Sequence, residues 1–242
     1  MNGKSRRRGS MLVWWTVIAV LLAGFAPAGA IAARPKDDPP LFLSPSTRPY
    51  GRSYSKWAAM WWQWALAEPK ATNPIIDPNG ADCAEGQSGK VWFLAGSPTP
   101  VTRNCTVPAG KALFFPVINS AYFAFLDDPP EQRTEEFLRA QVSFVRKGAT
   151  GLSATIDEAR FNKIRRRLYT ESTLFRVVLP ADNLFGLPEG FVLNPSVDAG
   201  FYLMIAPLSP GSHTIHLTGT LPTPSSVDAT YHITVRRGRG DG

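Results

Sequence analysis

Four oxygen-bearing side chains fall within nine residues of a turn-rich segment, and their chemistry is that of a calcium site. They are Asp77, Asn79, Asp82 and Glu85. Calcium binds carboxylate and amide oxygens in flexible geometry, but the EF-hand spacing is not met because Gly80 stands fourth rather than sixth in the segment. Turn-forming Asp and Asn, which bond to their own backbone, explain the same residues. We therefore expect no resident cofactor and keep calcium as the one alternative.

Three histidines near the C-terminus, His213, His216 and His232, are the candidate ligands for zinc or copper. Side chains alternate between the faces of a strand, so His216 and His232 can share the solvent face while His213 lies on the inner face. Two histidines fall short of the three or four ligands of such a site, so no metal is predicted. If the loop between their strands centres near Pro224, His216 lies directly opposite His232.

The sequence contains no GxSxG elbow, HExxH motif or P-loop. Ser212 and His213 are neighbours in sequence only, which does not make a catalytic triad. Glycan hydrolysis needs two carboxylates that face each other across a cleft. Candidates in or near expected loops are Asp157, Glu158, Glu171, Asp182 and Asp198. No pair among them stands out, so we favour a role other than catalysis and leave enzymatic activity open.

Tryptophans dominate the segment that follows the first prolines. A helix is predicted over residues 53–68, ending before Pro69. One face of it is aromatic and consists of Tyr54, Trp57, Trp61 and Trp64. Such a stripe predicts a helix docked on a sheet, with a glycan platform or a membrane-surface helix as alternatives. Trp62, which lies off the stripe, and Trp92 are the candidate ligand-binding residues.

The first thirty residues have the order of a secretory signal peptide: a basic start, an apolar run over residues 11–25, and small residues at 28–30. An uncleaved anchor is the alternative, because the apolar stretch continues to Ala33. We expect cleavage, and secretion or a periplasmic location without a membrane span. The net charge of the whole chain is +7. The leader contributes four positive charges and contains no acidic residue, so the mature chain has a net charge of +3. A nucleic-acid partner is therefore not supported.

Cys83 and Cys105 are the only cysteines. Two cysteines in one exported domain usually form a disulfide bond, which would stabilise this chain by about 3 kcal/mol. A thiol nucleophile or a metal ligand is the alternative, but the sequence lacks a CxxC motif and its histidines are more than a hundred residues away.

The remaining pattern predicts one mainly β domain over residues 53–236. Expected strands are 91–95, 111–118, 152–156, 174–179, 201–206, 212–219 and 230–236. Their short, regular spacing favours an antiparallel β-sandwich of immunoglobulin-like or jelly-roll type. The N-terminal helix and an inserted helix over 129–147 complete the domain. A proline-rich linker is expected at 31–52 and a disordered tail at 237–242.

Several segments together resemble a family of uncharacterised exported microbial proteins. They are WWQW at 61–64, the run from Cys83 through GQSG at 86–89 to VWFLAG at 91–96, CTVPAGK at 105–111, FPVIN at 115–119 and PGSHTIH at 210–216. The resemblance covers most of the mature chain and implies export and paired cysteines. It implies no activity, because none is established for the family.

These observations favour an exported β-sandwich with a binding or structural role at the cell envelope. A carbohydrate or other envelope component is the expected partner, because aromatic side chains on β-sandwiches bind glycans by stacking. The alternatives are a glycan-active hydrolase that uses loop carboxylates and an envelope scaffold without a small ligand. A pocket with two carboxylates would favour the hydrolase, and burial of every tryptophan would favour the scaffold.

Overall fold

The computed structural model describes residues 41–237. Chain contacts define two compact units, residues 1–34 and 35–242. Residues 41–237, all in the second unit, contain three hydrophobic cores, which is the apolar interior that a domain needs to fold alone. The expected signal peptide, the first ten residues of the expected linker and residues 238–242 of the expected tail lie outside the described residues.

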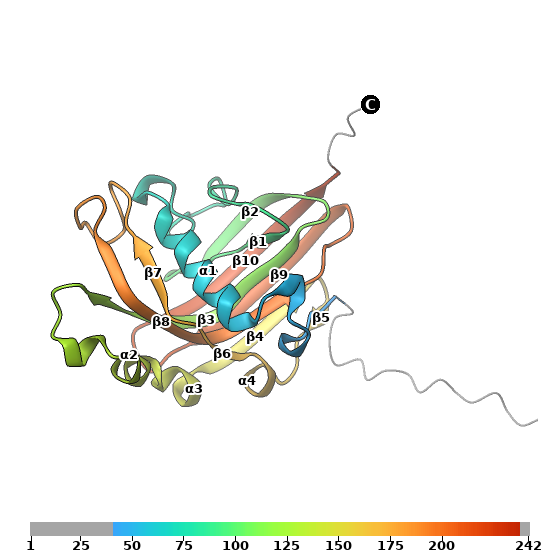
Figure 1. Ribbon diagram of the computed structural model, residues 1–242. Coiled ribbons are helices and arrows are strands. Elements are labelled where there is room, and N and C mark those ends of the chain that lie inside the picture. The colour runs from blue at the N-terminus through green and yellow to red at the C-terminus, as the bar shows by residue number, and fades with distance from the viewer. Residues whose placement is uncertain (1–40, 238–242) are drawn as a thin grey trace, which may run out of the picture. The chain divides into compact units, whose positions relative to one another are not determined.

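Two five-stranded sheets pack face to face as a sandwich, which confirms the predicted fold class (Figure 1). The first sheet contains β1 (Val91–Phe93), β3 (Ala112–Phe125), β8 (Val192–Ile205) and β6 (Tyr169–Glu171) in that order, with β7 (Phe175–Val178) also paired to β8. The second contains β2 (Val101–Pro108), β10 (Ser226–Arg236), β9 (Gly211–Thr220), β4 (Thr150–Ile156) and β5 (Ala159–Arg160). The main core lies between the sheets.

Both sheets are mixed rather than purely antiparallel. At one edge of each sheet two strands run parallel, β1 with β3 and β2 with β10. Parallel neighbours require a crossover connection, and the chain makes the first one by passing through β2 in the opposite sheet. The strands β2, β5 and β6 lie outside the ranges predicted from the sequence.

The helix α1 (Tyr54–Ala67) begins at Ser53, whose side chain accepts a hydrogen bond from the Lys56 amide at 3.2 Å. Its aromatic stripe is buried against the outer face of the first sheet, as predicted. The three stripe indoles donate to main-chain carbonyls, Trp57 to Pro49 at 3.0 Å, Trp61 to Leu94 at 2.9 Å and Trp64 to Glu85 at 2.9 Å. Helix and core together bury both faces of this sheet, which explains its continuous apolar sequence.

The expected helix over 129–147 is three shorter segments. They are η4 (Pro130–Arg133), α2 (Glu135–Val142) and α3 (Phe144–Gly148). Thr134 divides the first two, because its side chain caps α2 by accepting from the Phe137 amide at 3.2 Å. A short helix α4 (Ile164–Arg167) follows β5, and α2, α3 and α4 lie along one side of the domain (Figure 1).

Residues 41–52 do not form the extended linker that was expected. Phe42 forms a β-bridge with Ile205, and the amide of Leu43 donates to the Met204 carbonyl at 3.0 Å. The 3-10 helices η1 (Pro45–Thr47) and η2 (Pro49–Gly51) follow, and η3 (Lys70–Thr72) comes after α1. The domain therefore begins at least twelve residues before position 53, because these residues hydrogen-bond to the end of β8.

Cys83 and Cys105 form the predicted disulfide bond, and their Cα atoms are 6.0 Å apart. The bond links the turn-rich segment before β1 to the edge strand β2. Both cysteines belong to the main core.

Candidate functional site

A cavity of about 170 Å³ lies beside α1 and is lined by the loop after β1, by β3 and by the hairpin between β9 and β10. Its apolar lining consists of Trp61, Trp62, Ile75, Pro98, Ile118 and Val227. Its polar side chains are Ser97, Asn119, Ser225 and Ser226. We call it the Trp62 cavity. An apolar pocket with a few converging polar groups is the usual form of a small-ligand site.

Trp62 is held in a fixed orientation at this cavity. The helix turns it away from the buried stripe, and its ring packs edge-on against Trp61 and Phe123 at centroid distances of 5.0 and 5.4 Å. Its Nε1–H donates to Oδ1 of Asp198 at 2.7 Å. The ring is therefore half-buried and rigid, and it lines the cavity.

Asp198 is wholly buried in β8 and is the centre of a polar network. Its Oδ2 accepts from the Tyr202 hydroxyl at 2.9 Å, and that hydroxyl accepts from Nδ2 of Asn119 at 2.7 Å. Because Asn119 and Trp62 both line the Trp62 cavity, the network connects this cavity to the carboxyl group from two sides. Gly200 makes room for it, since a Cβ there would lie 2.6 Å from Cβ of Asn119 and 2.8 Å from the Tyr202 ring.

The electrostatics of this network are dominated by burial. Burial raises the pKa of Asp198 to about 7, although hydrogen bonds from Trp62, Tyr202 and Asn119 lower it. Burial and the nearby Asp198 carboxylate raise the pKa of the Tyr202 hydroxyl well above its usual value. The carboxyl group can therefore exchange a proton near neutral pH while its tyrosine neighbour stays protonated.

From the sequence, Asp198 was expected in or near a loop, whereas it lies within strand β8. Asn119 and Tyr202 were not predicted as site residues. A signal was present, because Asp198 and Asn119 stand within mostly apolar segments. A polar residue in a strand buried on both faces needs a hydrogen-bonding partner. That requirement would have directed attention to both positions.

A second buried charge, Arg103, projects from β2 and is fully buried. Its Nε donates to the Asp77 carbonyl at 2.7 Å, and Nη2 donates to the Ile75 carbonyl at 3.0 Å. Nη1 donates to the Ala95 carbonyl at 2.8 Å and to the Tyr231 hydroxyl at 2.7 Å. Ile75 and Asp77 belong to the turn-rich segment, Ala95 follows β1, and Tyr231 lies in β10. Arg103 therefore connects three parts of the chain.

The calcium candidates lie in that turn-rich segment. Asp77 is buried, and its Oδ1 accepts from the amides of Asn79 at 3.0 Å and Gly80 at 2.8 Å, while Oδ2 accepts from the Asp82 amide at 3.1 Å. This is the backbone-bonding turn that was the alternative explanation. Among residues 41–237, no three His, Cys, Asp or Glu side chains gather as a metal-binding group.

Trp92 does not fit the ligand-binding role predicted for it. Its side chain belongs to the main core between the sheets, and only 6% of its surface is exposed. Alternation explains the error, since in β1 the flanking Val91 and Phe93 face α1 while Trp92 faces the opposite sheet.

The register predicted for the histidines was wrong by two residues. His216 is paired with Thr230 and His232 with Thr214 across β9 and β10. His216 instead contacts Asp228, with 2.9 Å between Nε2 and Oδ1. His213 lies at the start of β9, where its Nδ1 is 3.0 Å from Oδ2 of Asp157.

The other carboxylates proposed for hydrolysis do not converge. Asp157 contacts His213, and Glu171 accepts a hydrogen bond from the Tyr169 hydroxyl at 2.8 Å. Glu158 and Asp182 are exposed. Each of the four most prominent cavities among residues 41–237 has at most one carboxylate in its lining.

The chain matches no protein-family model, no curated protein and no solved structure. A function for the protein must therefore come from the chemistry of its own residues.

Proposed function

We propose that this is an exported binding protein of the cell envelope that holds one small carbohydrate unit in the Trp62 cavity. The observation that carries the proposal is the rigid Trp62 ring, fixed by its hydrogen bond to Asp198 and lining a cavity that also contains polar side chains. A preorganised aromatic ring loses little conformational freedom when a ligand binds.

The lining suits a sugar, which has apolar C–H faces and hydroxyl groups at its edge. Trp62 supplies a surface for the apolar face. The amide of Asn119 supplies a directed acceptor, because its Nδ2 is used by Tyr202 and no donor among residues 41–237 reaches its Oδ1. Ser97, Ser225 and Ser226 add hydroxyl groups at the same cavity.

The size of the cavity limits the ligand. Pockets for drug-sized ligands usually have volumes of about 300–1,000 Å³, whereas the Trp62 cavity has about 170 Å³. It therefore suits a single ring or the end of a chain better than a stretch of polysaccharide.

An envelope scaffold without a small ligand is the second candidate, and burial of the tryptophans favours it. Trp57, Trp61, Trp64 and Trp92 are all buried, so Trp62 alone among the tryptophans of residues 41–237 is partly open to solvent. A glycan hydrolase is less well supported, because the Trp62 cavity has no carboxylate in its lining.

Calorimetric titration of residues 35–242 with a panel of monosaccharides and short glycans tests the proposal. Ser226→Phe adds a ring to the lining of the cavity while leaving the residues Trp62 and Asp198 unchanged. Its matched control is Thr234→Phe, on the exposed face of the same strand. We expect binding by the wild type, at least a tenfold loss with S226F and no change with T234F. Equal binding by both variants, or no binding of any sugar by the wild type, would contradict carbohydrate binding and favour the scaffold.

A further inference from the structure

Two sequence stretches around the α3 and α4 helices contain cations without acids. Residues 137–156 and 159–170 include eight lysines and arginines and no aspartate or glutamate. Six of these cations lie on α3 or at α4 and are exposed: Arg146, Lys147, Lys163, Arg165, Arg166 and Arg167. We call these six side chains the basic face.

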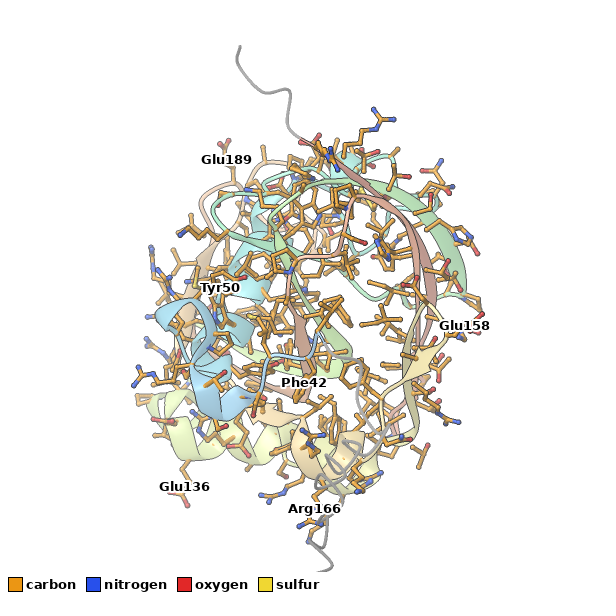
Figure 2. The ribbon with its side chains drawn as sticks, turned by 90° about the vertical axis from the view of Figure 1, so that its right-hand side faces the viewer. Phe42, Tyr50, Glu136, Glu158, Arg166 and Glu189 are labelled. Carbon is orange, nitrogen blue, oxygen red and sulfur yellow. A yellow bond between two sulfur atoms is a disulfide. The ribbon has the colours of Figure 1, made fainter. Side chains whose placement is uncertain are left out.

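The fold brings the two helices together. The Arg165 guanidinium donates to the Arg146 carbonyl at 2.8 Å and also to the Ala149 carbonyl, both at the C-terminal end of α3. The two helices lie next to each other along one side of the domain (Figure 1). Figure 2 shows Arg166 projecting outward at this end, with Glu189 at the opposite end.

Acids flank the two stretches in the sequence: Glu135 and Glu136 precede the first, Asp157 and Glu158 separate them, and Glu171 follows the second. Three of these acids have other partners, and Glu135 pairs with Arg139 at 2.6 Å. Glu171, which lines the same groove as Arg146, accepts from the Tyr169 hydroxyl and lies 3.7 Å from Nη1 of Arg139. Asp157 contacts His213. Within residues 41–237, the side chains of Lys147 and Arg166 make no hydrogen bond or ion pair, so these two charges of the face are not neutralised there.

The N-terminal end of the described chain lies at the same face. The Arg167 guanidinium is 4.9 Å from the centroid of the Phe42 ring, and Phe42 packs against Phe161 at 5.5 Å. Arg167, one of the six cations of the basic face, therefore lies beside the first described residues of the domain.

We infer that the basic face docks on a membrane surface that carries anionic phospholipids. Guanidinium and ammonium groups donate hydrogen bonds to phosphate, and each Lys or Arg near an anionic bilayer increases binding roughly fivefold. The face does not share a residue with the Trp62 cavity, so membrane docking and carbohydrate binding can succeed or fail separately.

Co-sedimentation of residues 35–242 with vesicles tests the inference. Residues 1–34 are omitted because their apolar run would partition into any bilayer. The vesicles contain phosphatidylcholine alone or with phosphatidylglycerol at one lipid in three. The K147E/R166E variant reverses two charges of the basic face. K70E/R236E makes the same change in net charge at exposed positions outside it.

We expect the wild type to bind the phosphatidylglycerol vesicles, with little binding to phosphatidylcholine alone. Binding should weaken at least about 25-fold in K147E/R166E, from two contributions of roughly fivefold, and should weaken steeply with added salt. Equal loss in K70E/R236E would show attraction by net charge alone and overturn the inference. So would binding that does not depend on phosphatidylglycerol, or retention by duplex DNA without binding to vesicles.

Discussion

Arg103 and Asp198 are both completely removed from solvent, yet they are held by different kinds of partner. Three of the Arg103 acceptors at 2.7–3.0 Å are main-chain carbonyls, whose positions are set by the backbone. The Asp198 carboxylate is held by side chains, Trp62 and Tyr202, and through Tyr202 by Asn119. A buried charge held by backbone fixes the fold, whereas one held by side chains at a cavity can respond to what occupies that cavity.

The largest expected effect comes from Arg103. Replacing it by methionine removes the donor from the Asp77 and Ile75 carbonyls and from the Tyr231 hydroxyl, while the Ala95 carbonyl keeps a hydrogen bond from Tyr231. Each buried acceptor left without a donor typically costs about 1–3 kcal/mol, so the loss of three donors should cost at least about 3 kcal/mol. We expect Arg103→Met to lower the free energy of unfolding in urea by about that amount. Arg176→Met, at an exposed position of β7, is the control. A loss below about 1 kcal/mol would show that the carbonyls do not depend on Arg103.

Asp198 should instead produce a pH dependence. Its pKa is about 7 in the folded state and about 3.9 in an unfolded chain. The folded state therefore binds this proton more tightly, and the free energy of unfolding should fall as pH rises from about 4 to 7, by at most about 1.4 kcal/mol per pH unit. Above that range the contribution is constant.

Asp198→Asn should remove this slope, and Glu158→Gln, at an exposed turn, should leave it unchanged. Urea unfolding at a series of pH values measures both. The same slope in D198N and the wild type would mean that another group is responsible and that the carboxyl group does not titrate in this range.

The smallest effect on stability is expected for the pair of His213 and Asp157, which is more exposed to solvent than Arg103 or Asp198. Burial alone lowers the pKa of His213, but hydrogen bonds to Asp157 and to the Ser209 carbonyl, with the charge of Asp157, raise it overall. Burial alone raises the pKa of Asp157, but hydrogen bonds to His213 and to the Thr214 amide, with the charge of His213, lower it overall. The histidine contribution is complete below about pH 6.5 and the aspartate contribution above about pH 4, so the pair stabilises most between these values.

We expect Asp157→Asn to lower the pKa of His213, as followed by NMR of the imidazole. It should cost less than about 1 kcal/mol of stability, because the carboxylate is half exposed. Asp228→Asn, which removes the partner of His216 instead, should leave the His213 titration unchanged. An unaltered pKa in D157N would contradict the role given to Asp157.

The sequence predicted the elements whose pattern is local. The stripe of α1 and its end before Pro69 depend on neighbouring residues, and the structure has both. Strand β2 was missed because Arg103 stands at an inward position where an apolar residue would be expected. Its burial depends on carbonyls from distant segments, which local alternation cannot reveal.

The site depends on register and was harder to predict. The loop between β9 and β10 was centred on Pro224, whereas the pairing of Ser226 with Thr220 centres it on Thr223. A register shift of two residues keeps every side chain on its face of the sheet but changes its cross-strand partner. His216 was therefore predicted opposite His232, whereas it lies opposite Thr230. The Asp198 network likewise needs the pairing of β3 with β8, which places Asn119 beside Gly200.

The parallel pairing of β2 with β10 has a consequence for the order of folding. The edge strand that carries Cys105 and Arg103 finds its neighbour only in the last strand of the domain, more than a hundred residues later. The second sheet therefore cannot be completed until β10 has been synthesised. Contacts this distant in sequence slow folding, so the segment from β2 to β9 must wait for its last partner.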